Sequence, residues 1–218
     1  MLIRTINASD PDPEILAQAA AVIERGGVVA CPTDTLYGLF ADATNADAVL
    51  RLFELKGRPA DRAVPLVADS AAQIEADIGP LPPLAQRLAA RWWPGPLSLL
   101  IPVGPAIVPG VHGDTGLVAV RIPAHPLARA LCRIVGHPLT ATSANRSGEP
   151  PATTADEVRE RVGEGLSLLL DGGPAPGGPP STIVDASGAE PKLVRAGAVE
   201  WAHVLTSLKG SDGSASLT

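Results

Sequence analysis

The sequence predicts an α/β fold in which a twisted mixed sheet is flanked by helices. Short apolar runs typical of strands alternate along the chain with helix-like segments, which is the pattern of this fold class. Hydrophobic residues make up 45% of the 218 residues, enough to bury a sizeable core. Aromatic residues are only 3%, so aliphatic side chains must build most of that core.

The N-terminal elements follow from apolar runs and capping residues. Residues 2–6 predict a strand. The next helix is expected to run to Arg25, because Asp10 is suited to cap its N-terminus, Pro11 to its first position, and two glycines follow its end. Residues 28–31 then predict a short buried strand that stops at a proline.

The rest of the chain is divided in the same way. Residues 32–38 are interpreted as a loop, because a proline opens the segment and a glycine closes it. Residues 45–55 predict a helix, because their apolar side chains recur on one face. The remaining helices are expected at residues 71–76, 84–92, 126–135, 155–162 and 199–208, and the remaining strands at residues 64–67, 97–101, 117–122, 138–142, 167–170, 182–185 and 192–195.

One folded domain is expected over residues 1–208, followed by a disordered polar tail over residues 209–218. The longest apolar runs are too short to span a membrane, and the N-terminus lacks the basic and apolar regions of a signal peptide. The two cysteines stand in apolar surroundings without the spacing of metal ligands, which favours reduced thiols. These features predict a cytoplasmic protein that does not bind membranes.

The charge of the chain limits its function. A formal net charge of −6 argues against a domain whose main role is to bind nucleic acid through phosphates, because such domains are usually basic. A local cationic pocket is still compatible with it, since Arg51, Lys56, Arg58 and Arg62 lie in one short segment. The sequence has no Walker-type loop, Gly-x-Gly-x-x-Gly, His-Glu-x-x-His or Gly-x-Ser-x-Gly motif, so a hydrolase has little support.

Two segments place polar groups directly after predicted strands. Residues 140–148, Thr-Ala-Thr-Ser-Ala-Asn-Arg-Ser-Gly, bring hydroxyl and amide groups to the edge where ligands bind in α/β sheets. A turn that caps the strand explains the same residues. Thr33 and Thr35 follow the strand at residues 28–31, and they serve either as local caps or as groups that orient a small polar ligand.

Several cations occupy comparable places. Lys56 and Arg58 flank a glycine in a turn that is expected to be solvated, where they either stabilise a helix C-terminus or bind a triphosphate. Arg121 leaves an apolar strand, which makes it a candidate to bind a carboxylate or a phosphate. Arg195 follows a similar apolar run, and Ser181 precedes one.

Six sequence blocks, taken together and in order, indicate a protein family more specifically than any single motif does. They are Pro-Thr-Asp-Thr-Leu-Tyr-Gly-Leu from Pro32, Lys-Gly-Arg from Lys56, Trp-Trp-Pro-Gly-Pro-Leu-Ser from Trp92, Val-Arg-Ile-Pro from Val120, Thr-Ser-Ala-Asn-Arg-Ser-Gly from Thr142 and Ser-Thr-Ile-Val-Asp from Ser181. In this order the blocks resemble the YrdC-like family of threonylcarbamoyl-adenylate synthases. The chain is most similar to the short, single-domain form of that family.

The resemblance implies a YrdC-like fold and an enzyme that condenses L-threonine, bicarbonate or CO₂, and ATP into threonylcarbamoyl-AMP and pyrophosphate. The product serves the threonylcarbamoyladenosine modification of tRNA, so a transfer complex and tRNA are implied as weak or transient partners. Mg²⁺ would be carried by the phosphates, without a metal site on the protein. The implied ligands of L-threonine are Thr33, Arg121, Ala141 and Ser181, and those of ATP are Lys56, Arg58, Ser143, Asn145 and Arg195, with Lys56 and Arg58 also catalytic.

The chain departs from the family pattern at two places. The stretch between Arg58 and Pro65 is longer than the usual loop of the family. Many members carry a His shortly after the Pro-Leu pair, where this chain has Val67-Ala68-Asp69. Two alternatives to the main interpretation stay open: a non-catalytic RNA-binding module of the same fold, and a related protein that takes another carbamoyl-type ligand.

Overall fold

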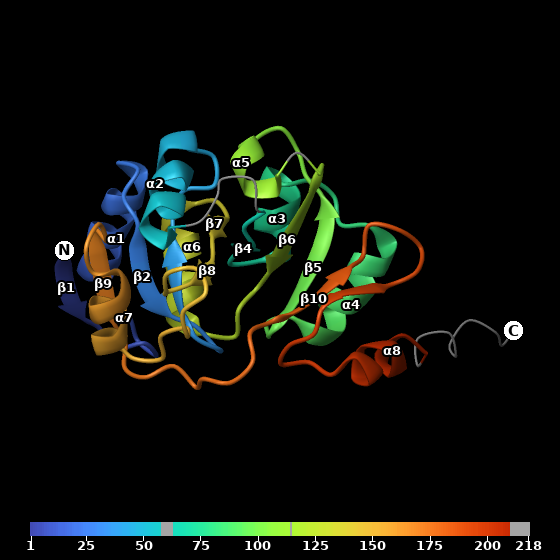
Figure 1. The fold of residues 1–218 in the computed structure, drawn as a ribbon. Helices are drawn as coiled ribbons and strands as arrows, with labels where there is room; N and C mark the ends of the chain where they lie inside the picture. Colours follow the sequence, from blue (N-terminus) through green and yellow to red (C-terminus); the bar gives the residue numbers. More distant parts are fainter. Residues whose placement is uncertain (58–62, 114, 210–218) are drawn as a thin grey trace, which may run out of the picture.

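The computed structural model describes residues 1–57, 63–113 and 115–209. It confirms the predicted α/β class, with helices packed around mixed sheets (Figure 1). The strands divide between two sheets, one five-stranded and one six-stranded, where the sequence suggested a single sheet. The predicted disordered tail lies outside the described residues except for Lys209, which ends the last helix.

The first sheet has the order β1-β9-β2-β3-β8. β1, β9 and β2 run parallel, whereas β3 pairs antiparallel with both β2 and β8. β2 and β3 therefore form a hairpin, and its tight turn lies at the end of two buried strands. The bounds are β1 (Leu2–Thr5), β9 (Leu168–Asp171), β2 (Val29–Pro32), β3 (Tyr37–Phe40) and β8 (Thr142–Ser143).

The second sheet has the order β11-β10-β5-β6-β4-β7. β10 runs parallel to β5, and β4 runs parallel to β6, while the other neighbours are antiparallel. Both kinds of pairing occur in each sheet, as predicted. The bounds are β11 (Lys192–Arg195), β10 (Thr182–Asp185), β5 (Leu97–Pro102), β6 (Leu117–Arg121), β4 (Leu66–Val67) and β7 (Leu139–Thr140).

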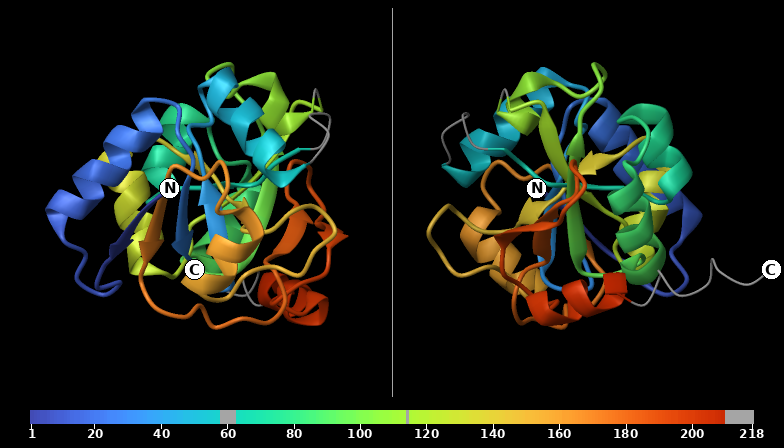
Figure 2. Two further views of the ribbon diagram at one scale, coloured as in Figure 1. Left: turned by 60° about the vertical axis from the view of Figure 1, so that its left-hand side comes forward. Right: turned by 90° about the vertical axis from the view of Figure 1, so that its right-hand side faces the viewer.

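The helices cover the outer faces of the sheets (Figures 1 and 2). α1 and α6 pack together against β2, and α7 packs against β9. α4 packs against both β5 and α8, while α2 contacts α5. The bounds are α1 (Pro13–Glu24), α2 (Ala46–Lys56), α3 (Ala71–Asp77), α4 (Pro83–Trp92), α5 (Pro109–His112), α6 (Pro126–Val135), α7 (Ala155–Val162) and α8 (Trp201–Lys209).

Aliphatic side chains form the core in two clusters. The smaller cluster, which includes Ile23 and Leu131, lies where α1 and α6 cover the first sheet. The larger cluster, which includes Leu52 and Leu99, extends from the first sheet through the second. Burial of this apolar surface is the main force that holds the two sheets together as one body.

The first helix begins two residues later than predicted. Asp12 is the N-cap of α1, and its side chain accepts a hydrogen bond from the backbone N–H of Glu14 at 2.8 Å. The sequence contains the pair Asp-Pro twice in succession, at Asp10 and again at Asp12, and both pairs fit the rule for a helix start. Only the second pair lies at the start of the apolar face that packs on the sheet.

Two predictions near the sheet boundary need correction. The loop predicted over residues 32–38 is confined to a turn at residues 33–36, because Pro32 ends β2 and Tyr37 begins β3, whose residues are all buried. The single strand predicted at residues 138–142 is split at Ala141, because β7 belongs to the second sheet and β8 to the first. The chain crosses between the sheets at this point, and the crossing brings residues 140–148 to the boundary between them.

Cys31 and Cys132 are free thiols without solvent exposure, so we expect neither to react in the folded protein. Burial raises the pKa of both thiols, for Cys132 from 9.0 to about 12. The thiolate is the reactive form, so the raised pKa lowers the fraction of each thiol that can react at neutral pH. Iodoacetamide should label both residues only in urea-unfolded protein, measured by mass spectrometry. Rapid labelling under native conditions would contradict this expectation.

Candidate functional site

A cavity of about 430 Å³ lies between the two sheets, beside the point where the chain crosses from one to the other. Its walls come from the β2–β3 turn, from β8, and from the ends of β4, β6, β10 and β11. Six of the nine site residues predicted from the sequence line this cavity. They are Thr33, Arg121, Ala141, Ser143, Ser181 and Arg195.

Thr33 shapes the turn between β2 and β3. Its hydroxyl donates to the carbonyl of Leu36 at 2.8 Å and accepts from the backbone N–H groups of Thr35 and Leu36. The Thr33 and Thr35 hydroxyl oxygens are also 3.1 Å apart. The local capping role is therefore real, and it holds both threonines at the wall of the cavity, where a ligand can contact them.

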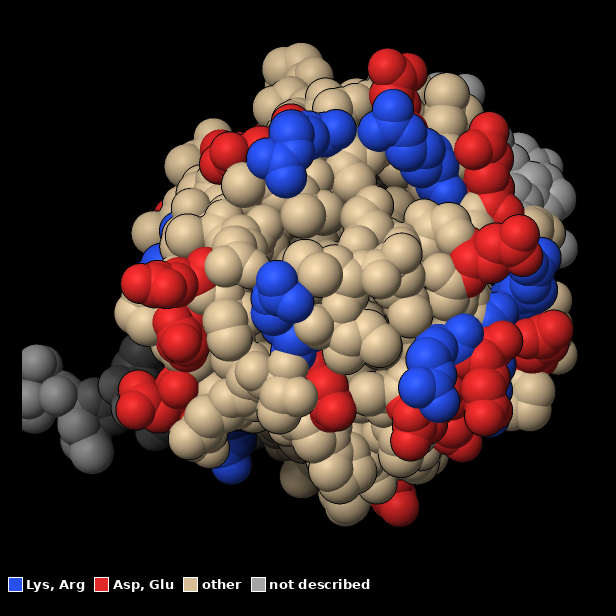
Figure 3. Space-filling model, turned by 90° about the vertical axis from the view of Figure 1, so that its left-hand side faces the viewer, with Lys and Arg blue, Asp and Glu red and all other residues tan. Residues whose placement is uncertain are grey.

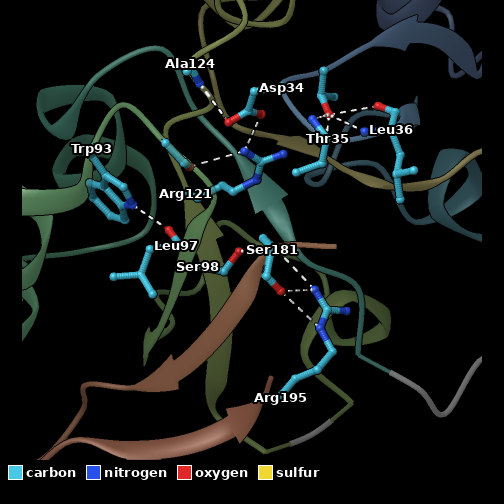
Figure 4. A network of polar contacts seen from close by, with 12 residues as sticks. Asp34, Thr35, Leu36, Trp93, Leu97, Ser98, Arg121, Ala124, Ser181 and Arg195 are labelled. Carbon is cyan, nitrogen blue, oxygen red and sulfur yellow. Dashed lines mark hydrogen bonds and ion pairs between the residues drawn. The ribbon is translucent and has the colours of Figure 1, made fainter. Parts of the chain in front are cut away.

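Arg121 ends β6 and is buried beneath this turn, where its Nη1 has two partners. It donates to Oδ1 of Asp34 at 2.5 Å and to the carbonyl of Gly95 at 3.2 Å (Figure 4). The side chains of Arg121 and Asp34 are only 7% and 12% exposed, so this is a buried ion pair. The other oxygen of the Asp34 carboxylate accepts from the backbone N–H of Ala124 at 3.2 Å.

A second polar chain joins β5, β10 and β11. The Ser98 and Ser181 hydroxyl oxygens are 2.9 Å apart. Nη2 of Arg195 donates to the carbonyl of Ser181 at 2.7 Å and to its hydroxyl at 3.1 Å (Figure 4). Burial lowers the pKa of the Arg195 guanidinium, and the positive charge of Arg121 lowers it further. The two guanidinium groups repel each other electrostatically. An anion bound in the cavity would be attracted by both and would relieve that repulsion.

The expectation that Lys56 lies in a solvated turn is wrong. Lys56 is 4% exposed, and its Nζ donates to the carbonyls of Ser143 at 2.6 Å and Asn145 at 2.9 Å. Its own carbonyl accepts from the N–H of Ser147 at 2.8 Å. Lys56 thereby holds the end of α2 against the segment after β8, outside the cavity lining. Arg58 lies outside the described residues.

Asn145 is also used within this segment. Its amide nitrogen donates to the carbonyls of Arg146 at 2.8 Å and Glu149 at 2.7 Å, and its side-chain oxygen lies 3.4 Å from Nζ of Lys56. Asn145 is buried and does not line the cavity. Lys56 and Asn145 thus form a support beneath Ser143, which does line it.

One of the two polar backbone groups of Ala141 also has a hydrogen-bond partner within the protein. Its N–H donates to the carbonyl of Pro65 at 2.7 Å, which ties the crossing segment to the start of β4. Contact between this backbone and a ligand is therefore left to the carbonyl group, which accepts hydrogen bonds. Beyond Pro65, Val67 forms part of the cavity wall, and none of Val67, Ala68 and Asp69 is the His that the family resemblance implies for this stretch.

Sequence reasoning missed Asp34 and Ser98. Both lie inside sequence blocks that carry the family resemblance, Asp34 between two threonines and Ser98 after a Pro-Leu pair. A polar residue that ends or interrupts a buried strand was the available signal. Their roles depend on partners 87 and 83 positions away in the chain, so the sequence alone did not single them out.

Metal and membrane sites are not found in the described part of the chain. No group of three or more His, Cys, Asp and Glu side chains is placed there to hold a metal ion. Among the same residues, no helix is both long and apolar enough to cross a lipid bilayer. On the side of the molecule that carries β1, basic and acidic side chains are interspersed and do not form a basic surface (Figure 3).

Known proteins share both the sequence and the arrangement of this chain. The family model Sua5_yciO_yrdC, described as "Telomere recombination", matches residues 21–197. A threonylcarbamoyl-AMP synthase of Bacillus subtilis is 42% identical over 89% of this chain, which spans 56% of that protein. A putative threonylcarbamoyl-AMP synthase of Mycobacterium tuberculosis is 37% identical, with 93% of this chain and 94% of that protein covered.

The fold is shared with a crystal structure of Pyrococcus abyssi Sua5 complexed with L-threonine. The TM-score is 0.90 at 36% identity, over 95% of this chain and 61% of that one. This chain thus spans little more than half of the B. subtilis and P. abyssi proteins and nearly all of the M. tuberculosis one. Because the family model covers most of the residues and the fold agrees closely, the chain belongs to the Sua5/YciO/YrdC family.

Proposed function

We propose that this chain is a threonylcarbamoyl-AMP synthase, which joins L-threonine, bicarbonate or CO₂, and ATP and releases pyrophosphate. The names of its relatives in B. subtilis and M. tuberculosis support the proposal. The observation that carries it is the cavity between the sheets, where two guanidinium groups and several hydroxyl groups meet. Such a cavity suits two anionic reactants that must be held side by side.

The site residues divide between the two substrates according to the resemblance. Arg121 would bind the carboxylate of L-threonine, because a buried guanidinium can take a carboxylate with two parallel hydrogen bonds. Arg195 and Ser143 would contact the nucleotide. Lys56 would act as a positioning residue for the nucleotide side, since its ammonium holds the segment that carries Ser143. The full division assigns Thr33, Arg121, Ala141 and Ser181 to L-threonine, and Lys56, Arg58, Ser143, Asn145 and Arg195 to ATP.

The chemistry needs positioning more than a protein nucleophile. The amine of threonine forms a bond to the carbon of CO₂ and loses a proton, which gives a carbamate. A carbamate oxygen then attacks the α-phosphorus of ATP, and the bond from that phosphorus to the bridging oxygen breaks as pyrophosphate leaves. Fixed cations such as Arg195 stabilise the charge that develops on the phosphates. Orientation of the two bound reactants supplies much of the rate.

Mg²⁺ would enter on the phosphates of ATP. Asp34, a carboxylate of the β2–β3 turn, already pairs with Arg121, and the described residues offer no cluster of metal ligands. Mg²⁺ commonly binds through substrate phosphates and retained water with few protein ligands, which fits this arrangement.

We further propose that the product passes to a separate transfer complex, which modifies tRNA, and that the protein is cytoplasmic like its tRNA targets. The alternative of a non-catalytic RNA-binding module is not favoured. The net charge of −6 and the mixed charges of the face in Figure 3 offer little to a phosphate backbone.

Pyrophosphate release from ATP is expected to require both L-threonine and bicarbonate. Omission of either should reduce release to the background, because the attacking carbamate needs both. L-valine, which has nearly the shape of threonine but lacks the hydroxyl group, is the matched control and should support less release. Mass spectrometry should detect threonylcarbamoyl-AMP only in the complete reaction. Equal pyrophosphate release without threonine would contradict the proposed function.

A further inference from the structure

Asp34 is placed to control the side chain that faces the proposed amino-acid substrate. We propose that Asp34 is a positioning residue, which fixes the guanidinium of Arg121 in the orientation that receives the carboxylate of L-threonine. This inference rests on the proposed function. The carboxylate of Asp34 is held in one orientation, because Arg121 donates a hydrogen bond to one of its oxygens and the backbone N–H of Ala124 donates to the other.

The contacts of Arg121 are unequal around its guanidinium. Both of its hydrogen bonds start from Nη1, to Asp34 and to the carbonyl of Gly95. Within residues 1–57, 63–113 and 115–209 no acceptor is found for Nη2 or Nε, and Figure 4 shows the second terminal nitrogen turned toward the Thr35 turn. A planar guanidinium that is held at one corner by two acceptors keeps its opposite edge in a fixed direction. That edge is available for a bidentate contact with a carboxylate.

Asp34 also connects the two walls of the cavity. It belongs to the turn between β2 and β3 of the first sheet, whereas Arg121 ends β6 of the second. Ala124, its other partner, lies between β6 and α6. The ion pair therefore bridges the sheets beside the cavity. Loss of the Asp34 charge would release Arg121 from its position. It would also weaken the contact that holds the two sheets in place on either side of the substrate.

The environment of the pair provides a reporter other than activity. Burial lowers the pKa of the His125 imidazole, and the negative charge of Asp34 raises it. Substitution of Asp34 by Asn removes that charge while it keeps the size of the side chain. The pKa of His125 should therefore fall in the variant, which an NMR titration of the imidazole can follow. A variant that merely unfolded would instead move this pKa toward its unperturbed value.

The test measures L-threonine binding by calorimetry and steady-state kinetics in Asp34→Asn, with Asp156→Asn as the matched control. Asp156 pairs with Arg159 in an exposed ion pair on α7, away from the cavity lining. Asp34→Asn should weaken threonine binding about tenfold or more, as expected when a charge-assisted contact is misaligned, and change the KM for ATP little. Asp156→Asn should behave as the unsubstituted protein.

A double-substitution cycle with Arg121→Lys separates positioning from a general structural effect. If Asp34 acts through Arg121, then Asp34→Asn should have little further effect on threonine binding once Arg121 is Lys. Additive effects, or undiminished threonine binding in Asp34→Asn, would overturn the proposal. If the Asn variant does not fold, Asp34→Glu keeps the charge but displaces it by one methylene, and it should also weaken binding; wild-type binding there would overturn the proposal. Absence of threonine binding by the unsubstituted protein would overturn the proposed function and this role together.

Discussion

Substitution of Arg121 by Lys is expected to raise the KM for L-threonine about tenfold to a hundredfold, while the KM for ATP changes little. Lys keeps the positive charge opposite Asp34 but loses the planar fork that receives a carboxylate with two hydrogen bonds. A hydrogen bond to a charged group contributes about 1.5–3 kcal/mol, which corresponds to this range in affinity. Because the amine of threonine must remain free to form the carbamate, the carboxylate is the natural anchor.

Arg159→Lys is the matched control for this prediction. Arg159 also pairs with an Asp, but both side chains are exposed, at 54% and 79%. Exposed pairs contribute little to stability, and this one lies outside the cavity, so both KM values should stay unchanged. Steady-state pyrophosphate release with each substrate varied in turn gives the two constants. A rise in the KM for ATP in Arg121→Lys would make Arg121 a phosphate ligand and would reverse the proposed division of the site.

The elements of the fold could be predicted where local rules decide them. α6 and α7, and likewise β10 and β11, occupy the predicted residues, because each has a clear apolar pattern and a defined start. The division into two sheets could not be predicted in the same way. It depends on the crossing at Ala141, where one residue separates β7 from β8, and nothing in a five-residue apolar and hydroxyl segment distinguishes that from one strand.

The candidate site shows the same boundary between local and long-range information. Arg121, Ser181 and Arg195 were predicted to be polar groups beside apolar strands, and the structure brings them to one cavity. The partner of Arg121 was not predicted, because in the sequence Asp34 has the features of an ordinary turn residue. Only the folded structure shows that it contacts Arg121. The burial of Lys56 was missed for a similar reason. Its partners follow β8, far along the chain, and only the packed structure removes its ammonium from water.

Substitution of Lys56 by Ala is expected to destabilise the protein as well as to reduce its activity. Nζ of Lys56 contacts the carbonyls of Ser143 and Asn145, and the carbonyl of Ser143 keeps a second donor in the N–H of Asn145. The carbonyl of Asn145 loses this donor in the variant. A buried polar group that loses its partner costs about 1–3 kcal/mol, so the free energy of unfolding should fall by about that amount.

Urea unfolding and kinetics together show how Lys56 acts, with the exposed Lys209→Ala as the control of unchanged stability. Lys56→Met keeps an unbranched apolar side chain of similar length, with sulfur in place of one methylene, and removes the ammonium, so its unfolding midpoint reports the loss of the polar contacts with little change in packing volume. We expect the Met and Ala variants to lose stability and to raise the KM for ATP, because the segment that carries Ser143 is no longer held. If both variants matched the unsubstituted protein in urea but lost turnover, the ammonium would have to reach the nucleotide directly. Its hydrogen bonds to Ser143 and Asn145 would then form only in the absence of ATP and would break when ATP binds.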